Sequence, residues 1–573
     1  ENVRPASVHT EASRVSYSRS REPRASSSRP RRSCDVLPCN RAFSRKAKNL
    51  DSARGPAAKE AFREALVSGA QRPSSVKLGF VGAARAGKTS TLRALAGLPL
   101  RIGEESTLGL AVWELYHKLL SARPGKWHLQ EARGASSTER WDREIAQFVA
   151  ERVQKPRESG DLSCSSNCQL LPSAGNEPDE AVLRKLPVNL IANRLGTNGS
   201  NEEECKVVLE TYDFGGQEVY YAMHHLFLTD NGIYLACIDL SMVQHTADGN
   251  ADGIGDLMDD EGTTGTEQGW GALEWWLASI TISAPNSLVA IVGTHDDCLE
   301  PGVRPRVHQL VHQRIVDLCT RIPELNLRLK VNENAQLCFF PIDNSSVDNG
   351  RSASALRAAI DDMASNLLAG SLNDEAIPLR WTHFWAALQR ATSDDRLGPL
   401  CRVEDLWKKC SHYGFESQAE LQRFLKHFSR IGVLLNFPDA PSENLRELVC
   451  LEPAWIAEAA ASVLVAKDRV LQGCTRYSVD LRENGRLHSE LLAAIWRPRT
   501  FARHQKQLVD LLQVLDLLMP WEKDKVSMPQ SQHASAHQVY LVPSLLPLKP
   551  RKPQGEPRAD TLEEDSIVMY LDF

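Results

Sequence analysis

A glycine-rich stretch in the first hundred residues carries the clearest chemistry in this sequence. Gly82–Thr89 (GAARAGKT) matches the pattern G-x-x-x-x-G-K-[ST]. In such a loop, backbone N–H groups surround phosphate oxygens, and the N-terminus of the next helix adds its positive end. We expect Lys88 to reach the β- and γ-phosphates of a nucleotide and Thr89 to bind Mg²⁺. The expected nucleotide-binding residues are Gly82, Ala83, Ala84, Arg85, Ala86, Gly87, Lys88, Thr89 and Ser90.

A second motif, DFGGQE, follows an expected strand over 207–212. Its spacing is that of D-x-x-G-Q in small GTPases. On that interpretation, Asp213 holds Mg²⁺ through water, the Gly216 N–H senses the γ-phosphate, and Gln217 orients the attacking water. The alternative, the D-F-G of a protein kinase, fails because no H-R-D-x-x-x-x-N catalytic loop precedes it. The motif therefore favours nucleotide hydrolysis.

A third motif indicates which base is bound. Thr294-His295-Asp296-Asp297 follows the apolar stretch LVAIVG. A carboxylate can accept hydrogen bonds from both N1–H and N2–H₂ of guanine, and adenine offers neither donor. We expect Asp297 to read guanine.

The elements that must position these motifs alternate between strands and helices from residue 76 to about 368. This alternation predicts a parallel α/β sheet with covering helices. Two long insertions interrupt the series, over about 118–200 and 243–268. The expected strands are Val76–Val81, Val207–Tyr212, Gly232–Asp239, Leu288–Val292 and Leu337–Ile342.

Composition limits the remaining possibilities. The chain has 573 residues and a net charge of −6, which argues against a general nucleic-acid binder. No apolar stretch reaches 18 residues, so we expect no transmembrane helix. Thirteen cysteines without a disulfide framework, and no apolar signal sequence, indicate a cytoplasmic protein with reduced thiols. Residues 1–55 are basic and rich in Arg and Ser, so we expect them to be disordered; a transit peptide is the alternative.

The C-terminal third, residues 373–573, has a different pattern. Ser417 followed by Glu420 predicts a capping box at the start of a helix. Two strands, Val433–Phe437 and Leu448–Leu451, come after that helix. A helix followed by a hairpin indicates a winged-helix-like part within residues 373–475. A second α+β part, residues 476–573, ends in the strand Ile567–Leu571.

Together these motifs resemble a known family. The order of P-loop, DFGGQE, HHLFLTDNGIYLACIDL and VGTHDD is similar to the Roc domain, the Ras-like GTPase of Roco proteins, in which T-H-x-D replaces N-K-x-D. The later segments IPLRW, ELQRFLKHFSRIGVLLNFPD, LVCLEPAWIAEA and YLVPSLLP are similar to the COR domain. The expected fold class is therefore α/β: a Ras-like P-loop doubly wound sheet over 75–368, followed by an α/β COR module with a winged-helix-like part.

The resemblance implies further residues and properties. Thr107 in ESTLG matches switch I and would close over Mg²⁺ and the γ-phosphate. Asn344 and Ser345 lie where the last guanine-contacting loop belongs. The implied activity is that of a GTPase that binds GTP and GDP with Mg²⁺ as a signalling switch or scaffold, with Gln217, Thr107 and Lys88 as catalytic residues. Unidentified protein partners and a homodimer through COR are implied as well. The last COR part is expected to be incomplete, leaving an apolar strand edge.

Several alternatives stay open on the sequence. One is a GTP-dependent interaction scaffold that does not hydrolyse GTP, and another is a P-loop ATPase of the STAND type. The second leaves Thr294–Asp297 unexplained. Arg85 is either a solvated loop residue or a group that stabilises transferring charge. The loop Asp248–Asp259 has the oxygen spacing of a Ca²⁺ loop, but its last position is Asp rather than Glu. We expect it to bind Ca²⁺ weakly or not at all.

Overall fold

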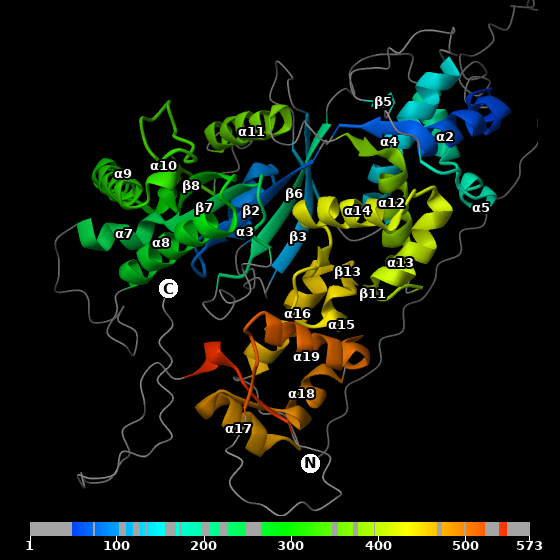
Figure 1. The fold of residues 1–573 in the computed structure, drawn as a ribbon. Helices are drawn as coiled ribbons and strands as arrows, with labels where there is room; N and C mark the ends of the chain where they lie inside the picture. The colour runs from blue at the N-terminus through cyan, green and yellow to red at the C-terminus, as the bar shows by residue number, and fades with distance from the viewer. Residues whose placement is uncertain are drawn as a thin grey trace, which may run out of the picture. The chain divides into compact units, whose positions relative to one another are not determined.

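The computed structural model (Figure 1) describes residues 48–72, 75–101, 110–118, 127–131, 135–154, 168–170, 175–196, 206–216, 227–247, 265–345, 353–370, 376–394, 396–466, 473–497, 500–521 and 538–546. Its contacts divide the chain into Glu1–Lys48 and Asn49–Phe573, and everything below belongs to the second unit. Residues 49–54 are helical, although the sequence predicted disorder up to residue 55. Ala53 in this helix is buried.

A seven-stranded sheet forms the centre of the first region, in the order β4-β3-β6-β2-β7-β8-β9. β6, β2, β7, β8 and β9 run parallel, whereas β3 and β4 join one edge antiparallel. The bounds are β2 Ser75–Gly82, β3 Leu110–Lys118, β4 His128–Glu131, β6 Lys206–Phe214, β7 Ile233–Asp239, β8 Leu288–Thr294 and β9 Phe340–Pro341. This arrangement confirms the predicted α/β class.

Helices cover both faces of this sheet, as the buried strands require. Leu78 and Phe80 of β2 lie in a core with α3 and α11, whereas Val81 faces a core that contains α8, α9 and α16. The sheet is therefore doubly wound. The helices of this region are α3 Lys88–Leu95, α7 Leu240–Ala247, α8 Gly265–Ser283, α9 Arg304–Arg321, α10 Pro323–Asn326 and α11 Ser354–Ala369, with a 3-10 turn, η4, at Asp296–Cys298.

The first predicted insertion contributes to a different core. Helix α4, Ala135–Gln154, packs against α2, Pro56–Ser68, and against α12, Leu379–Ser393, from the C-terminal region. We call this second core, which also includes α14, the shared core. A small sheet joins the same three segments: β1 Gly69–Gln71 pairs with β5 Cys168–Leu170 and with β10 Ile377–Pro378. Two short helices complete the described part of the insertion, α5 Glu180–Leu183 and α6 Val188–Gly196.

A buried polar contact fixes α4 to α12 in the shared core. Asp142 Oδ1 lies 3.0 Å from Nδ1 of the buried His383, and Asp142 Oδ2 accepts from Arg390 at 2.5 Å. Burial alone would raise the pKa of Asp142, but these two partners lower it below its usual value. The insertion is therefore held to the C-terminal region by charge as well as by apolar packing.

The C-terminal region begins with a helix-and-hairpin unit, as the sequence predicted. It contains β11 Leu400–Arg402, α13 Val403–Cys410, η5 Ser411–Tyr413, α14 Gln418–Arg430, β12 Leu435–Asn436, α15 Glu443–Arg446 and β13 Leu448–Cys450. The strands form an antiparallel sheet in the order β11-β13-β12.

The predicted capping box forms in part. Ser417 Oγ accepts from the Glu420 N–H at 3.3 Å. The Glu420 carboxylate, however, accepts from the N–H of Glu416 and from the side chains of Arg380 and Trp381, each at 2.7 Å. It is drawn there because a buried carboxylate needs charged or polar donors.

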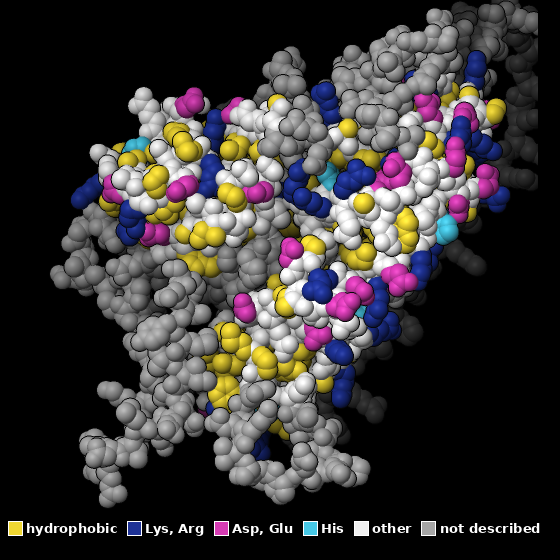
Figure 2. Space-filling view, viewed as in Figure 1, with side chains coloured by type: hydrophobic (Ala, Val, Ile, Leu, Met, Phe, Trp, Pro, Cys, Tyr) yellow, Lys and Arg dark blue, Asp and Glu magenta, His cyan; other side chains and the backbone are white. Residues whose placement is uncertain are grey.

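The remaining residues form a second helical part with a three-stranded sheet, β14-β16-β15. Its elements are α16 Pro453–Val465, α17 Thr475–Asn484, β14 Arg486–His488, α18 Ser489–Trp496, η7 Thr500–His504, α19 Gln505–Val514, β15 Met519–Pro520, β16 Val539–Leu541 and η8 Pro543–Leu545. The predicted strand Ile567–Leu571 and the loop Asp248–Asp259 lie outside the described residues. Among the helices described, none is long and apolar enough to span a membrane. Acidic and basic side chains are interspersed on the face shown in Figure 2.

Candidate nucleotide site

The phosphate-binding loop connects β2 directly to α3. Gly82 ends β2 with φ +137°, and Gly87 precedes α3 with φ +73°, both in the region that favours glycine. A Cβ on Gly82 would collide with the Cys237 carbonyl of the adjacent strand, so the loop begins where two backbones meet. Arg85, at the exposed tip, also has a positive φ, 61°. The sequence context predicted for the loop, strand before and helix after, is therefore present.

Lys88 lies under the loop and is buried. Its Nζ donates to the carbonyls of Gly82, at 3.0 Å, and Ala83, at 2.6 Å. Burial lowers the pKa of Lys88, against the opposing effect of the Asp213 carboxylate. A Cβ on Gly216 would collide with Lys88 Nζ and with the Ala83 backbone, so the chain after β6 passes close to the lysine because residue 216 is glycine. The P-loop and the DFGG segment are thus in contact.

Thr89 and Asp213 supply oxygen atoms beside the lysine. Thr89 Oγ1 donates to Asp213 Oδ2 at 2.6 Å, and Asp213 is buried. They meet because β2 and β6 are parallel neighbours, with Phe80 paired to Asp213. In the described part of the chain, no group of three or more His, Cys, Asp or Glu residues could hold a metal. One hydroxyl and one carboxylate still suit Mg²⁺, which binds few protein ligands when phosphates complete its shell.

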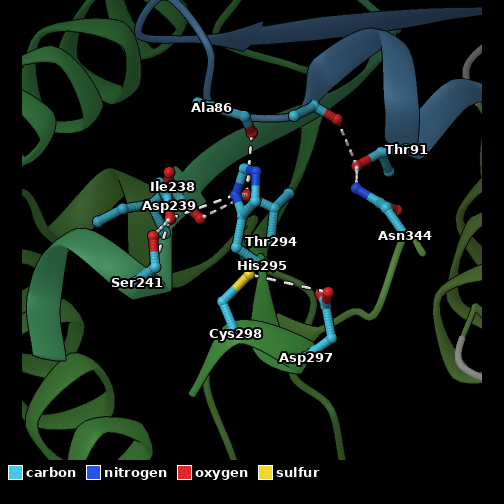
Figure 3. A network of polar contacts seen from close by, with 11 residues as sticks. Ala86, Thr91, Ile238, Asp239, Ser241, Thr294, His295, Asp297, Cys298 and Asn344 are labelled. Atoms are coloured by element: carbon cyan, nitrogen blue, oxygen red, sulfur yellow. Dashed lines mark hydrogen bonds and ion pairs between the residues drawn. The ribbon is translucent and has the colours of Figure 1, made fainter. Parts of the chain in front are cut away.

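Thr294 links the Thr294–Asp297 motif to the loop Gly82–Thr89 (Figure 3). Its Oγ1 lies 3.1 Å from the Ala86 carbonyl and 3.2 Å from the Ile238 carbonyl. Thr294 ends β8, and Ile238 lies in the adjacent β7. The hydroxyl therefore contacts three structural elements at once.

His295 adopts a left-handed backbone conformation, φ 55°, and turns its ring toward β7. Its Nδ1 lies 3.2 Å from Asp239 Oδ1. The same Asp239 oxygen accepts from the Ser241 N–H at 2.9 Å and from Ser241 Oγ at 2.6 Å. Burial disfavours the charge of Asp239, but the His295 and Ser241 contacts outweigh it and lower its pKa. Conversely, the hydrogen bond to Asp239 raises the pKa of His295.

The two aspartates after His295 differ in their surroundings. Asp296 is engaged by helix α9, because Oδ1 lies 2.7 Å from His308 Nε2 and Oδ2 lies 3.6 Å from Arg304. Asp297 is exposed, and its Oδ2 contacts the Cys298 thiol at 3.8 Å. Of the pair, Asp297 is the more exposed carboxylate, and Asp296 is the one paired with helix α9.

Asn344 comes from the loop after β9 and closes this side of the site. Its Nδ2 donates to Thr91 Oγ1 at 3.2 Å, and Thr91 in turn donates to the Gly87 carbonyl at 2.9 Å. Ser345 donates through its N–H and its hydroxyl to Asp343, at 2.8 and 2.6 Å. Asn344 thus reaches the first turn of α3, whereas Ser345 stabilises its own loop.

The described residues bring together most of the predicted site. Thr107 and Gln217 lie outside the described residues, so the assignments for the catalytic water stay predictions. Sequence reasoning missed Asp239, Ser241 and Thr91. A usable signal existed for Asp239, since polar residues at the carboxyl ends of parallel strands gather at one edge of the sheet.

Comparison with known proteins identifies similar chains. A family model described as "C-terminal of Roc, COR-A domain" matches residues 378–546. The probable serine/threonine-protein kinase pats1 of Dictyostelium discoideum is 22% identical over 359 residues, covering 59% of this chain and 9% of that protein. The leucine-rich repeat serine/threonine-protein kinase 1 of Mus musculus is 23% identical over 366 residues, covering 61% and 16%. This chain therefore matches less than a fifth of the length of either relative.

Solved structures are similar as well. Among them is the structure of the Methanosarcina barkeri Roco2 RocCORdC bound to GDP, with a TM-score of 0.45 and 15% identity, covering 83% of this chain and 97% of that one.

Proposed function

Because this chain is a Roco-family protein, with a Roc domain followed by a COR domain, we propose that it binds GTP and GDP with Mg²⁺ and slowly hydrolyses GTP. In this proposal it acts in the cytoplasm as a signalling switch or scaffold. Protein partners and a homodimer through the COR domain belong to the same proposal.

One observation carries the proposal: Thr294 Oγ1 contacts the Ala86 carbonyl of the phosphate loop at 3.1 Å, with Asp297 three residues further on. A base-reading motif beside a phosphate loop is what a nucleoside di- or triphosphate requires. The carboxylate at Asp297 favours guanine, since guanine offers two adjacent donors, N1–H and N2–H₂, whereas adenine has only its amino group, next to an acceptor nitrogen.

Each residue of the site has its own role in the proposed binding and hydrolysis of GTP. Lys88 neutralises charge on the β- and γ-phosphates, and its approach to Gly216 places it beside the segment that leads to Gln217. Thr89 and Asp213 would hold Mg²⁺, which neutralises charge on the transferred phosphoryl group when bound. Gln217 orients water and Thr107 closes over the γ-phosphate. Without an activator, hydrolysis by a site of this kind is slow, on the order of 10⁻⁴ per second in Ras.

Two other functions remain as competitors. A chain that binds GTP without hydrolysing it would act as a GTP-dependent scaffold, and single-turnover assays would show no phosphate release. A STAND-type ATPase would prefer adenine nucleotides. The contacts of Thr294 and the exposure of Asp297 count against the second, because a carboxylate gains two adjacent hydrogen bonds from guanine and only one from adenine.

Competition binding tests the proposal. A fluorescent GDP analogue bound to the full chain is displaced with GTP, GDP or ATP, with and without Mg²⁺. We expect GTP and GDP to displace it at concentrations at least about a hundredfold lower than ATP, which corresponds to about 2.7 kcal/mol. Equal displacement by ATP would reject the guanine assignment. Single-turnover hydrolysis of labelled GTP then decides between the GTPase and the scaffold.

A further inference from the structure

We propose that Asp239 is a positioning residue that holds His295 in its cationic form beside the bound nucleotide, so that nucleotide retention weakens as pH rises through the neutral range. This inference rests on the proposed guanine-nucleotide binding. It concerns Asp239, to which neither the motifs nor the comparisons assign a role.

Hydrogen-bond geometry fixes which nitrogen of His295 carries a proton. The Thr294 hydroxyl has one proton and lies within reach of two carbonyl acceptors, those of Ala86 and Ile238. Because the Asp239 carboxylate can only accept, the His295 Nδ1 beside it carries a proton, so the Thr294 oxygen 3.1 Å from Nδ1 accepts and the Thr294 proton goes to a carbonyl. The Nδ1–H also faces Asp239 Oδ1 at 3.2 Å. Nε2 is thus the nitrogen at which His295 gains or loses its second proton.

Asp239 is built as an anion. Oδ1 receives the Ser241 N–H and the Ser241 hydroxyl in addition to the imidazole, and these donors stabilise a carboxylate rather than a carboxylic acid. The contacts also fix its position at the junction of β7 and α7. An anchored anion at 3.2 Å orients the ring and favours the imidazolium form.

The other charged groups around His295 act in the same direction. The 3-10 turn after it contributes Asp297, whose negative charge also favours the imidazolium. The Cys298 thiol of that turn stays neutral, because burial and the charges of Asp297, Asp239 and Asp343 raise its pKa. The remaining acid, Asp296, is paired with His308 and Arg304. Within the described residues, the charges that act on the His295 ring are thus carboxylates.

A cation at this position favours a bound nucleotide in two ways. It attracts the negatively charged phosphates, and it interacts favourably with the electron-rich face of a purine. His295 lies two residues before Asp297, the expected guanine reader. The His295 side chain is 37% exposed, so a ligand can approach it. Its left-handed backbone, an unfavourable conformation for a non-glycine residue, is the kind of local strain that persists at functional sites.

Because contact with Asp239 raises the pKa of His295, the cation is complete below its ordinary value near 6.5 and is lost as pH rises through the raised value. Nucleotide affinity should fall over that interval. Replacing Asp239 removes the carboxylate that stabilises the His295 imidazolium, so the decrease in nucleotide affinity should occur at lower pH.

The test is the dissociation constant of a fluorescent GDP analogue, measured on the full chain from about pH 5.5 to about pH 8.5, a range that brackets the ordinary histidine pKa, at constant ionic strength and saturating Mg²⁺. The variants are Asp239→Asn, His295→Gln and His295→Lys. The lysine variant is the matched control, since its side chain keeps a positive charge over this whole pH range. Any pH dependence that it shows reports the titration of the nucleotide phosphates, which occurs near about pH 6.

The affinity of His295→Lys for the GDP analogue is the reference at each pH. Relative to that reference, we expect the unmodified chain to lose about two- to fivefold in affinity as pH rises. Asp239→Asn should move the midpoint of this loss to lower pH, and His295→Gln should be weak throughout and follow the lysine profile in shape. A wild-type profile identical to that of His295→Lys would overturn the inference while leaving guanine binding intact. Failure of the unmodified chain to bind GDP at any pH would reject the proposed function instead. Thermal unfolding of each variant checks that it is folded.

Discussion

The two ends of the candidate site are built in different ways. The phosphate end comes from one continuous run, Gly82–Ser90, joined by Asp213 and Gly216 from the neighbouring strand and the turn after it. The base end is assembled from distant parts of the chain, Asp239, Thr294–Asp297 and Asn344, which lie at the carboxyl ends of β7, β8 and β9. A short motif can therefore encode the first, whereas the second exists only once the parallel sheet has formed.

This difference determines what a substitution should do at each end. Within the described residues, Lys88 donates its hydrogen bonds to carbonyls of its own loop, so its replacement should chiefly affect phosphate binding. Thr294 holds a loop, a strand and a histidine together, so its replacement should affect both ligand and scaffold. The predictions below test this division.

The largest effect is expected at the phosphate end. Lys88→Ala removes the cation that reaches the phosphates, and losing one partner of a desolvated charge pair costs about 2–5 kcal/mol, or about 30- to 5,000-fold in affinity. Titration with GTP, GDP and guanosine measures it, and affinity for guanosine should change little. An equal loss for guanosine would mean that Lys88 supports the whole site rather than the phosphates alone.

A change in rate without a change in affinity is expected at Gln217. Gln217→Leu should slow single-turnover hydrolysis by on the order of tenfold or more, about 1.4 kcal/mol of barrier, because the amide acts in the transition state and adds little to ground-state binding. GTP affinity, measured in parallel, should stay within a few fold. Unchanged hydrolysis would mean that a group other than Gln217 orients the attacking water. An Arg85→Ala variant would then test the exposed arginine of the loop.

A smaller but broader effect is expected at the base end. Thr294→Val keeps the shape and removes the hydroxyl that bridges Ala86, Ile238 and His295, so we expect a loss of about 0.5–1.5 kcal/mol in stability and a severalfold loss in GDP affinity. Denaturant unfolding and GDP titration measure the two. Asn344→Ala, which removes a single bond to Thr91, should lower stability less. If Thr294→Val alters neither quantity, the two ends are independent.

Sequence reasoning succeeded where the signal is local. The strand that leads into Gly82 and the helix that follows are encoded in a few consecutive residues, and the apolar stretch before Thr294 marks β8. The α/β class followed from such signals, and the sheet order confirms it. The residues of the site agree in geometry with the motifs, but their roles remain predictions.

Sequence reasoning failed where partners are far apart in the chain. Asp142 and His383 are separated by 241 positions, and nothing in either segment indicates that α4 packs on α12. The insertion was expected to interrupt the first region, yet it helps to build the shared core with the C-terminal region. Asp239 was missed for the same reason, since its partner His295 follows a different strand, β8. The Glu420 carboxylate was placed in a capping box because its partner Arg380 is 40 residues away.

The central claim, that Asp297 reads guanine beside the phosphate loop, is tested most directly by the ratio of GDP to xanthosine diphosphate affinity in the unmodified chain and in Asp297→Asn. Xanthine presents a carbonyl where guanine presents an amino group, so it suits an amide better than a carboxylate. Each charged hydrogen bond contributes about 1.5–3 kcal/mol. We therefore expect the unmodified chain to prefer GDP at least about tenfold and Asp297→Asn to reverse that preference. A preference for GDP that is the same in both chains would contradict the account.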